Sequence, residues 1–189
     1  MKNPMHNPKR RRVLLSGAAL AGGLAISGCS GGDAKDRQLV FGSLADALAE
    51  LARLTTALAL NPGASWTWSK TLLHCAQSID YSMTGYPEAK SALFQHTAGA
   101  AAFAWFKSRG RMSHNLIEAI PGAATLDANA ASTHALAALR KSIENFQQFT
   151  GPLRPHFAYG TLDRVEYEKA HAMHIANHLS VFDLAPKAG

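Results

Sequence analysis

Residues 168–179 read Glu168-Lys-Ala-His171-Ala-Met-His174-Ile-Ala-Asn-His178-Leu179 and carry three of the nine histidines of the chain. An α-helix advances about 100° per residue, so His174 and His178 lie about 40° apart and one turn from each other. Both imidazoles can therefore reach one metal ion, as the i, i+4 pair of an HxxxH helix does. His171 shares this face but lies two turns from His178, too far to share the same ion easily. The pattern predicts a helix with a metal-binding face.

The sequence before this stretch also predicts helices. Residues 41–184 are rich in Ala and Leu and have few β-branched runs. Capping residues, apolar stripes and Gly or Pro breaks predict helices at about 43–60, 66–83, 91–107, 129–149 and 163–182. Ser43 and Ser65 are expected N-caps, and Asp163 with Glu166 has the form of a capping box. We expect an all-α fold, an antiparallel helix bundle. The core should include the tryptophans Trp66, Trp68 and Trp105, with Cys75 as a small buried packing residue.

A third metal ligand should come from a facing helix, because two histidines rarely suffice. His74 is the best candidate, since it lies in mid-helix within a polar stripe that either faces solvent or lines a cavity. The members of this stripe are Thr67, Thr71, His74, Ser78 and Tyr81. The alternative is that these histidines are core residues with backbone partners, and the residues alone leave both interpretations open. The spacing gives no partner for His114, His134 or His156, to which we assign no role.

The first 28 residues predict an export signal. Five of the basic residues precede residue 13, no acid occurs before Asp33, and residues 13–26 form an apolar run of 14 residues. A bilayer core needs roughly 20 apolar residues, so this run is typical of a signal peptide rather than of a spanning helix. The arginines Arg10 and Arg11 begin a run, Arg-Arg-Arg-Val-Leu, that resembles a twin-arginine export signal.

A lipid attachment site follows the apolar run. Ile26-Ser-Gly-Cys29 resembles a lipobox, in which the signal is cut before the cysteine and Cys29 is acylated. We therefore expect a signal peptide over residues 1–28, a tether over 29–40, a helical domain over 41–184 and a C-terminal tail over 185–189. The protein should be exported and anchored by its lipid to the periplasmic side of a bacterial membrane.

Cleavage before Cys29 changes the charge of the protein. The whole chain carries a formal net charge of +6, which at first suggests a nucleic-acid partner. The mature chain has 14 basic against 13 acidic residues, a net charge of +1. The basic excess belongs to the signal, and we expect no nucleic-acid partner.

Four sequence blocks resemble a known superfamily. They are Leu73-His-Cys-Ala-Gln-Ser-Ile-Asp-Tyr-Ser-Met-Thr-Gly-Tyr-Pro87, Ile120-Pro-Gly122, residues 151–160, and the histidine stretch from His171 to Leu179. Together they resemble the DinB/YfiT-like superfamily of metal-binding four-helix bundles, and more closely a bacterial family of unknown function within it. The resemblance implies a bundle that is often a homodimer, with three histidines from two helices around one divalent ion. On this chain the ligand positions fall on His74, His174 and His178.

The resemblance and the signal together give a functional hypothesis. Some superfamily members are transferases or isomerases that use low-molecular-weight thiols. We expect a metal-dependent hydrolase or thiol transferase acting on an unknown small molecule, with zinc or nickel as the ion. Four residues are candidates to orient ligands or substrate, Tyr167, His171, Gln77 and Tyr81. No acidic residue stands out as a general base, so no catalytic residue is assigned. Two alternatives remain, a non-enzymatic bundle that binds a ligand or partner, and a haem-binding bundle.

Overall fold

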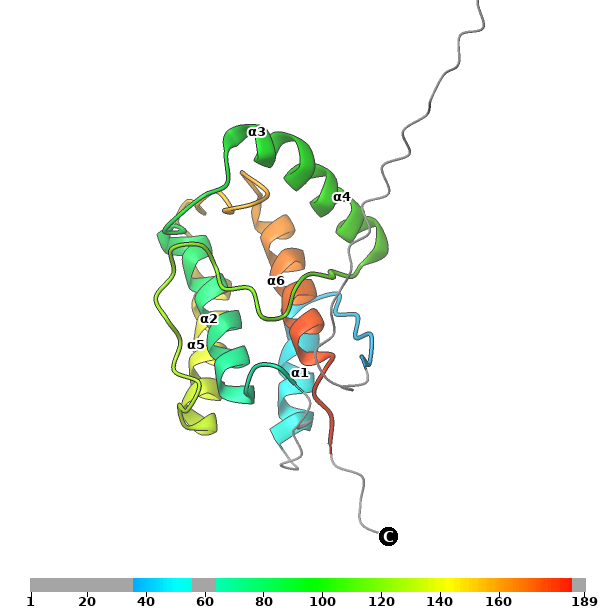
Figure 1. Cartoon of the computed structure of the whole chain (residues 1–189), viewed down its shortest axis with the longest axis vertical. Helices are drawn as coiled ribbons and strands as arrows, with labels where there is room; N and C mark the ends of the chain where they lie inside the picture. The colour runs from blue at the N-terminus through cyan, green and yellow to red at the C-terminus, as the bar shows by residue number, and fades with distance from the viewer. Residues whose placement is uncertain (1–35, 56–63, 185–189) are drawn as a thin grey trace, which may run out of the picture.

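The computed structural model describes residues 36–55 and 64–184, and these residues form helices connected by turns and loops (Figure 1). The predicted export signal, Cys29 and the C-terminal tail lie outside the described residues. The helical elements are α1 (Leu44–Thr55), α2 (Trp68–Thr84), α3 (Ala92–Phe94), the π-helical turn η1 (Gln95–Gly99), α4 (Ala100–Arg109), α5 (Ser132–Gln148) and α6 (Arg164–Leu179). No strand occurs within the described ranges. None of the described helices has the length and apolar character needed to cross a membrane.

The N-terminal signals predicted for α1 and α6 are confirmed. The Oδ1 of Asp163 accepts a hydrogen bond from the backbone of Glu166 at 2.7 Å, and the Glu166 carboxylate accepts one from the backbone of Asp163 at 3.3 Å, which completes the capping box. At α1 the Ser43 hydroxyl accepts from the Asp46 amide, and the Asp46 carboxylate accepts from the Ser43 amide. Each helix thus begins where its side chains satisfy the first free N–H groups.

Other predicted boundaries are wrong. The N-cap of α2 is Thr67 rather than Ser65, because the Thr67 hydroxyl accepts from the backbone of Lys70. Helix α5 begins at Ser132 rather than at residue 129, since an Asp127 carboxylate oxygen accepts from the Asn129 amide and holds those residues in a turn.

The helix predicted over 91–107 is interrupted by η1. A side chain at Gly99 would overlap the carbonyl oxygen of Ala158, so the chain approaches the turn at 156–160 where no Cβ is present. Helix α4 then runs on to Arg109 and ends at Gly110, whose φ is 61°. Phe103 is the buried residue of α4, whereas Trp105 is 59% exposed and does not lie in the core as expected.

Helix α6 lies at the centre of the molecule. It contacts both α1 and α2, while α2 packs against α5. A helix that presents one stripe to a core is amphipathic, but α6 has buried residues on nearly all sides, as a central helix must. They are Tyr167, Ala170, His171, Ala172, Met173, Ile175, Ala176, His178 and Leu179. The functional candidates of α6 are therefore surrounded by protein. Trp68 and Cys75 of α2 are also buried, as predicted.

Two pairs of neighbouring helices run in parallel. Ser69 and Ser132, near the starts of α2 and α5, have their hydroxyl oxygens 3.4 Å apart, and the Arg154 amide beyond α5 donates to the carbonyl of Ser82 near the end of α2. Likewise Arg53, near the end of α1, pairs with Asp183 just beyond α6 at 2.9 Å. Figure 1 shows α2 and α5 running opposite to α1 and α6. The expected antiparallel arrangement thus fails for these two pairs, because the long connection over 85–131 returns the chain before α5 begins.

Candidate metal centre

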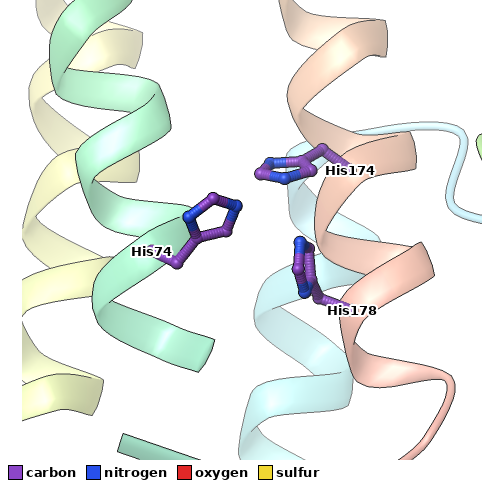
Figure 2. Close-up of side chains that lie close together, drawn as sticks. All are labelled: His74, His174 and His178. Atoms are coloured by element: carbon purple, nitrogen blue, oxygen red, sulfur yellow. The ribbon is translucent and has the colours of Figure 1, made fainter. Parts of the chain in front are cut away.

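Three histidines from two helices meet at the interface between α2 and α6. His74, His174 and His178 each offer a ring nitrogen, and these three atoms lie within 4.8 Å of one another. Figure 2 shows the rings pointing toward one another, His74 from one helix and the other two from the facing helix. Atoms this close can share one ion with only small side-chain movements, since zinc–nitrogen bonds are about 2.0–2.1 Å long. The predicted three-histidine cluster is confirmed as a geometric arrangement.

Helix periodicity explains the two contributions of α6. His174 and His178 are four residues apart, so their rings lie on one face of the helix, edge to face with centroids 4.7 Å apart. The pairing of α2 with α6 then brings His74 to 5.1 Å from His174 and 4.8 Å from His178, measured between ring centroids. The cluster is a direct result of helix packing, because its three ligand positions lie on helices rather than on loops, with His178 in the last turn of α6.

Burial keeps these imidazoles neutral. It lowers the pKa of His74 to about 4, and electrostatic interactions with His114 and Lys70 act in the same direction. The pKa values of His174 and His178 lie well below the ordinary value, again mainly because of burial and then because of the surrounding histidines. Neutral imidazole is the form that binds a metal, so the lone pairs are available at neutral pH.

Several ring nitrogens of this region are buried without a partner. Among the described residues, no hydrogen bond reaches His74 Nδ1, His114 Nε2, His171 Nε2 or His178 Nε2. Leaving a buried polar group unpaired costs about 1–3 kcal/mol, so four such groups in one region are expensive for the protein alone. The residues therefore fit a bound cation, which would convert unpaired nitrogen lone pairs into ligand bonds.

His114 is a fourth histidine at the same place. It belongs to the connection between α4 and α5, and its ring centroid lies 5.1 Å from that of His174 and 5.0 Å from that of His178. We call His74, His114, His174 and His178 the imidazole cluster. Sequence spacing could not have found His114, because it lies in an irregular segment with no periodicity.

Trp66 covers the cluster rather than the core. Its ring meets His74 edge-on at 5.1 Å and stacks on His178 at 6.3 Å. The ammonium of Lys70 lies 4.4 Å from the centre of the Trp66 ring. The Trp66 side chain is half-buried and reaches solvent. The expectation of a core position for Trp66 is therefore wrong.

A cavity of about 300 Å³ opens beside the histidines. Its volume lies at the lower end of the range for small-molecule sites. Histidines and apolar side chains make up much of its wall, including His74, His114, His156, His171, His174, Phe94, Met112, Ile120 and Phe157. An ion held by the three histidines would therefore lie next to a space that accepts a small, largely apolar molecule.

Comparison with known proteins identifies the family. The sequence matches the family described as "Protein of unknown function (DUF1569)" over residues 33–185. The chain belongs to the DUF1569 family. No curated protein and no solved structure matches it significantly. The match spans all of the described helices, so the imidazole cluster lies entirely within the DUF1569 domain.

The other predicted site residues of this DUF1569 domain lie around the cluster rather than in it. The Gln77 amide donates to the carbonyl of Ala124 at 3.1 Å, and the Tyr81 ring packs on Tyr86 at 5.7 Å. Tyr167 donates its hydroxyl to the carbonyl of Arg154 at 2.6 Å. Within the described residues none of these three hydrogen-bonds the ligand histidines. His171 lines the cavity, and its role toward a substrate stays a prediction.

A second group of aromatic side chains, which are buried or half-buried, surrounds His156. We call Tyr86, His156, Tyr159 and Tyr167 the tyrosine cluster. His156 stacks on Tyr159 at 4.2 Å, and its Nδ1 accepts from the backbone amides of residues 158 and 159 at 3.1 and 3.2 Å. Burial lowers the pKa of His156 to about 3, and His171 and His114 add to this effect. This position of His156 could not be predicted from spacing, because the turn at 156–160 has no helical periodicity.

Proposed function

We propose that this DUF1569 protein binds one divalent metal ion through His74, His174 and His178 and uses it as a metal-dependent hydrolase or thiol transferase. The observation that carries the proposal is the convergence of three neutral imidazoles from two helices, two of them buried and that of His174 half-buried, to within 4.8 Å. Zinc and nickel are the expected ions, because imidazole nitrogens suit both.

The cavity supports a catalytic rather than a purely structural role. A divalent ion, when bound, supplies the Lewis acidity that activates water or a thiol at neutral pH. His74 and His174 line the cavity as well as belonging to the ligand set. A small molecule in the cavity would therefore touch the same histidines that hold the ion. The unknown substrate should be small and mostly apolar, with one polar group directed toward the histidines.

The direction of the helices supports a DinB-like four-helix bundle. Helices α1 and α6 run one way and α2 and α5 the other, and the connection at 85–131 makes the parallel pair α2–α5. In this arrangement two helices that are far apart in the chain face each other across the ligand site. The topology is one solution to bringing a single histidine of α2 against the HxxxH pair of α6.

We further propose that the protein is exported by the twin-arginine route and anchored by lipid at Cys29. The support is the sequence pattern of the first 29 residues. The twin-arginine route carries folded proteins, so an ion could be loaded in the cytoplasm before export.

Metal binding is tested by titrating the metal-free protein with zinc and with nickel in a calorimeter. We expect one ion per chain for the wild type and no saturable binding for His174→Ala. His134→Ala is the matched control, because His134 lies on α5 and is exposed. A wild type that takes up neither metal would contradict the proposal.

Export is tested by fractionating cells that express the full chain. Replacing Arg10 and Arg11 together by Lys keeps the charge and should leave the protein in the cytoplasm. Cys29→Ala should allow export but abolish membrane attachment. Unchanged membrane-bound protein in both variants would overturn the export proposal and leave the metal proposal untouched.

A further inference from the structure

We propose that His114 is a fourth ligand of the metal centre, binding the ion through Nε2. This inference rests on the proposed metal function and adds a ligand from outside the helices. It would change the centre from three imidazoles on two helices to four imidazoles on three segments.

His114 lies next to the two ligands of α6, beside the group of His74, His174 and His178 whose ring nitrogens lie within 4.8 Å of one another. Within the trio the ring centroids lie 4.7–5.1 Å apart, and His114 lies 5.0 and 5.1 Å from the rings of His178 and His174. Two rings that bind one ion must keep this kind of separation, because each holds its own nitrogen near the same point. His114 also lines the cavity together with His74 and His174.

The hydrogen bonding of His114 is that of a metal ligand. Its Nδ1 lies 3.0 Å from the carbonyl oxygen of Asn115. A carbonyl can only accept, so Nδ1 carries the proton of the neutral ring and Nε2 holds the lone pair. Metal-bound histidines almost always donate their other N–H in this way, often to a backbone carbonyl. The Nε2 of His114 is buried and has no partner among the described residues, so its lone pair is not used by the protein.

The surrounding chain holds His114 in place. Met112 and Ile120 on either side of it are 4% and 5% exposed, so the connection is anchored by apolar burial at both ends. A loop held at two buried points can keep a ligand in position although it is not a helix. Its neighbours in the loop, by contrast, include the exposed Ile117. The ring is therefore held at the cluster by a segment that is buried at Met112 and Ile120 and mostly exposed between them.

A fourth imidazole would restrict the chemistry of the centre. A four-coordinate ion would be closed, as in structural zinc sites, whereas a five- or six-coordinate ion would keep one or two positions for water or substrate. If the centre is catalytic, an ion that accepts more than four ligands is favoured over tetrahedral zinc.

The number of nitrogen ligands can be counted directly with copper as the probe. Cu²⁺ binds imidazole strongly, and the nitrogen hyperfine structure of its electron paramagnetic resonance spectrum reports how many imidazoles are bound. We expect four in the wild type and three in His114→Phe, which keeps the size of the ring. The zinc affinity of His114→Phe should fall by more than about tenfold, the lower limit for outer partners of a metal ligand. His134→Ala should change neither quantity.

The outcomes separate the two proposals. A wild type with three nitrogens, or a His114→Phe variant with unchanged affinity and spectrum, would overturn the role of His114 while leaving the three-histidine site. A wild type that binds neither copper nor zinc would overturn both proposals. The nitrogen count of the wild type needs no variant, so the test holds even if His114→Phe folds poorly.

Discussion

The imidazole cluster and the tyrosine cluster each combine buried and half-buried side chains, yet they differ in how their polar atoms are satisfied. In the tyrosine cluster the Nδ1 of His156 accepts two backbone amides, and the hydroxyls of Tyr86 and Tyr167 donate to backbone carbonyls. In the imidazole cluster, by contrast, the ring nitrogens of three members are buried without partners in the described residues. The difference teaches that burial alone does not mark a functional histidine. An unpaired nitrogen that faces other unpaired nitrogens is the informative feature.

Acid should lower the free energy of unfolding through both clusters alike, and this is the largest effect that we expect. Burial lowers the pKa of His74 to about 4 and of His156 to about 3, whereas an unfolded histidine titrates near 6.5. Below pH 6.5 the unfolded chain therefore binds more protons than the folded chain, so stability is complete above this pH and falls as the pH falls. Each such histidine removes about 1.4 kcal/mol of unfolding free energy per pH unit.

Urea unfolding of the metal-free protein between pH 7.5 and 5 measures this effect. We expect His74→Phe and His156→Phe each to reduce the pH slope by about 1.4 kcal/mol per unit, and the exposed control His134→Ala to leave it unchanged. A stability that does not vary between pH 6.5 and 5 would show that these histidines are not kept neutral by the fold.

Metal binding should affect the stability of the two clusters differently, whereas acid should affect both alike. At a free zinc concentration about 1,000 times the dissociation constant, binding to the folded state adds about 4 kcal/mol of unfolding free energy. His178→Phe should lose this gain entirely, while His156→Phe should keep it. Without metal, His178→Phe should be at least as stable as the wild type, because it removes a buried nitrogen that has no partner.

Thermal unfolding with and without zinc tests both statements. A zinc-dependent rise in melting temperature in His178→Phe would mean that the ion binds elsewhere. Loss of the rise in His156→Phe would mean that the tyrosine cluster supports the metal site and that the two regions are not independent.

The smallest expected effect concerns Tyr167. Tyr167→Phe removes the hydroxyl that donates to the Arg154 carbonyl at 2.6 Å, and should lower the unfolding free energy by about 1 kcal/mol. Zinc affinity should not change, because this hydroxyl makes no hydrogen bond to the ligand histidines. A clear fall in zinc affinity would instead support the sequence-based prediction that Tyr167 orients the metal ligands.

The features that the sequence predicted well are those with helical periodicity. His174 and His178 follow from their spacing, the capping box marks the start of α6, and His74 follows from its place in a polar stripe and from the resemblance to DinB-like bundles. Periodicity says nothing about irregular segments. His114, His156 and Trp66 lie outside the helices, so their approach to the site depends on how the connections fold over α2 and α6.

The interruption of the third predicted helix and the relative directions of the helices could not be predicted from the sequence either. The π-helical turn η1 allows Gly99 to approach the backbone of Ala158, a contact between segments that local sequence does not encode. The parallel pairing of α2 with α5 depends on the path of residues 85–131, whose turns were predicted but whose end point was not. Long-range packing decided both features.

The most direct measurement is the location of the ion itself. A crystal of the zinc-loaded protein, measured on both sides of the zinc absorption edge, gives an anomalous difference map that shows zinc alone. We predict one peak per chain at about 2.0–2.1 Å from a ring nitrogen of each of His74, His174 and His178. A peak at any other position, or no peak in protein soaked at saturating zinc, would contradict the assignment of this cluster as the metal centre.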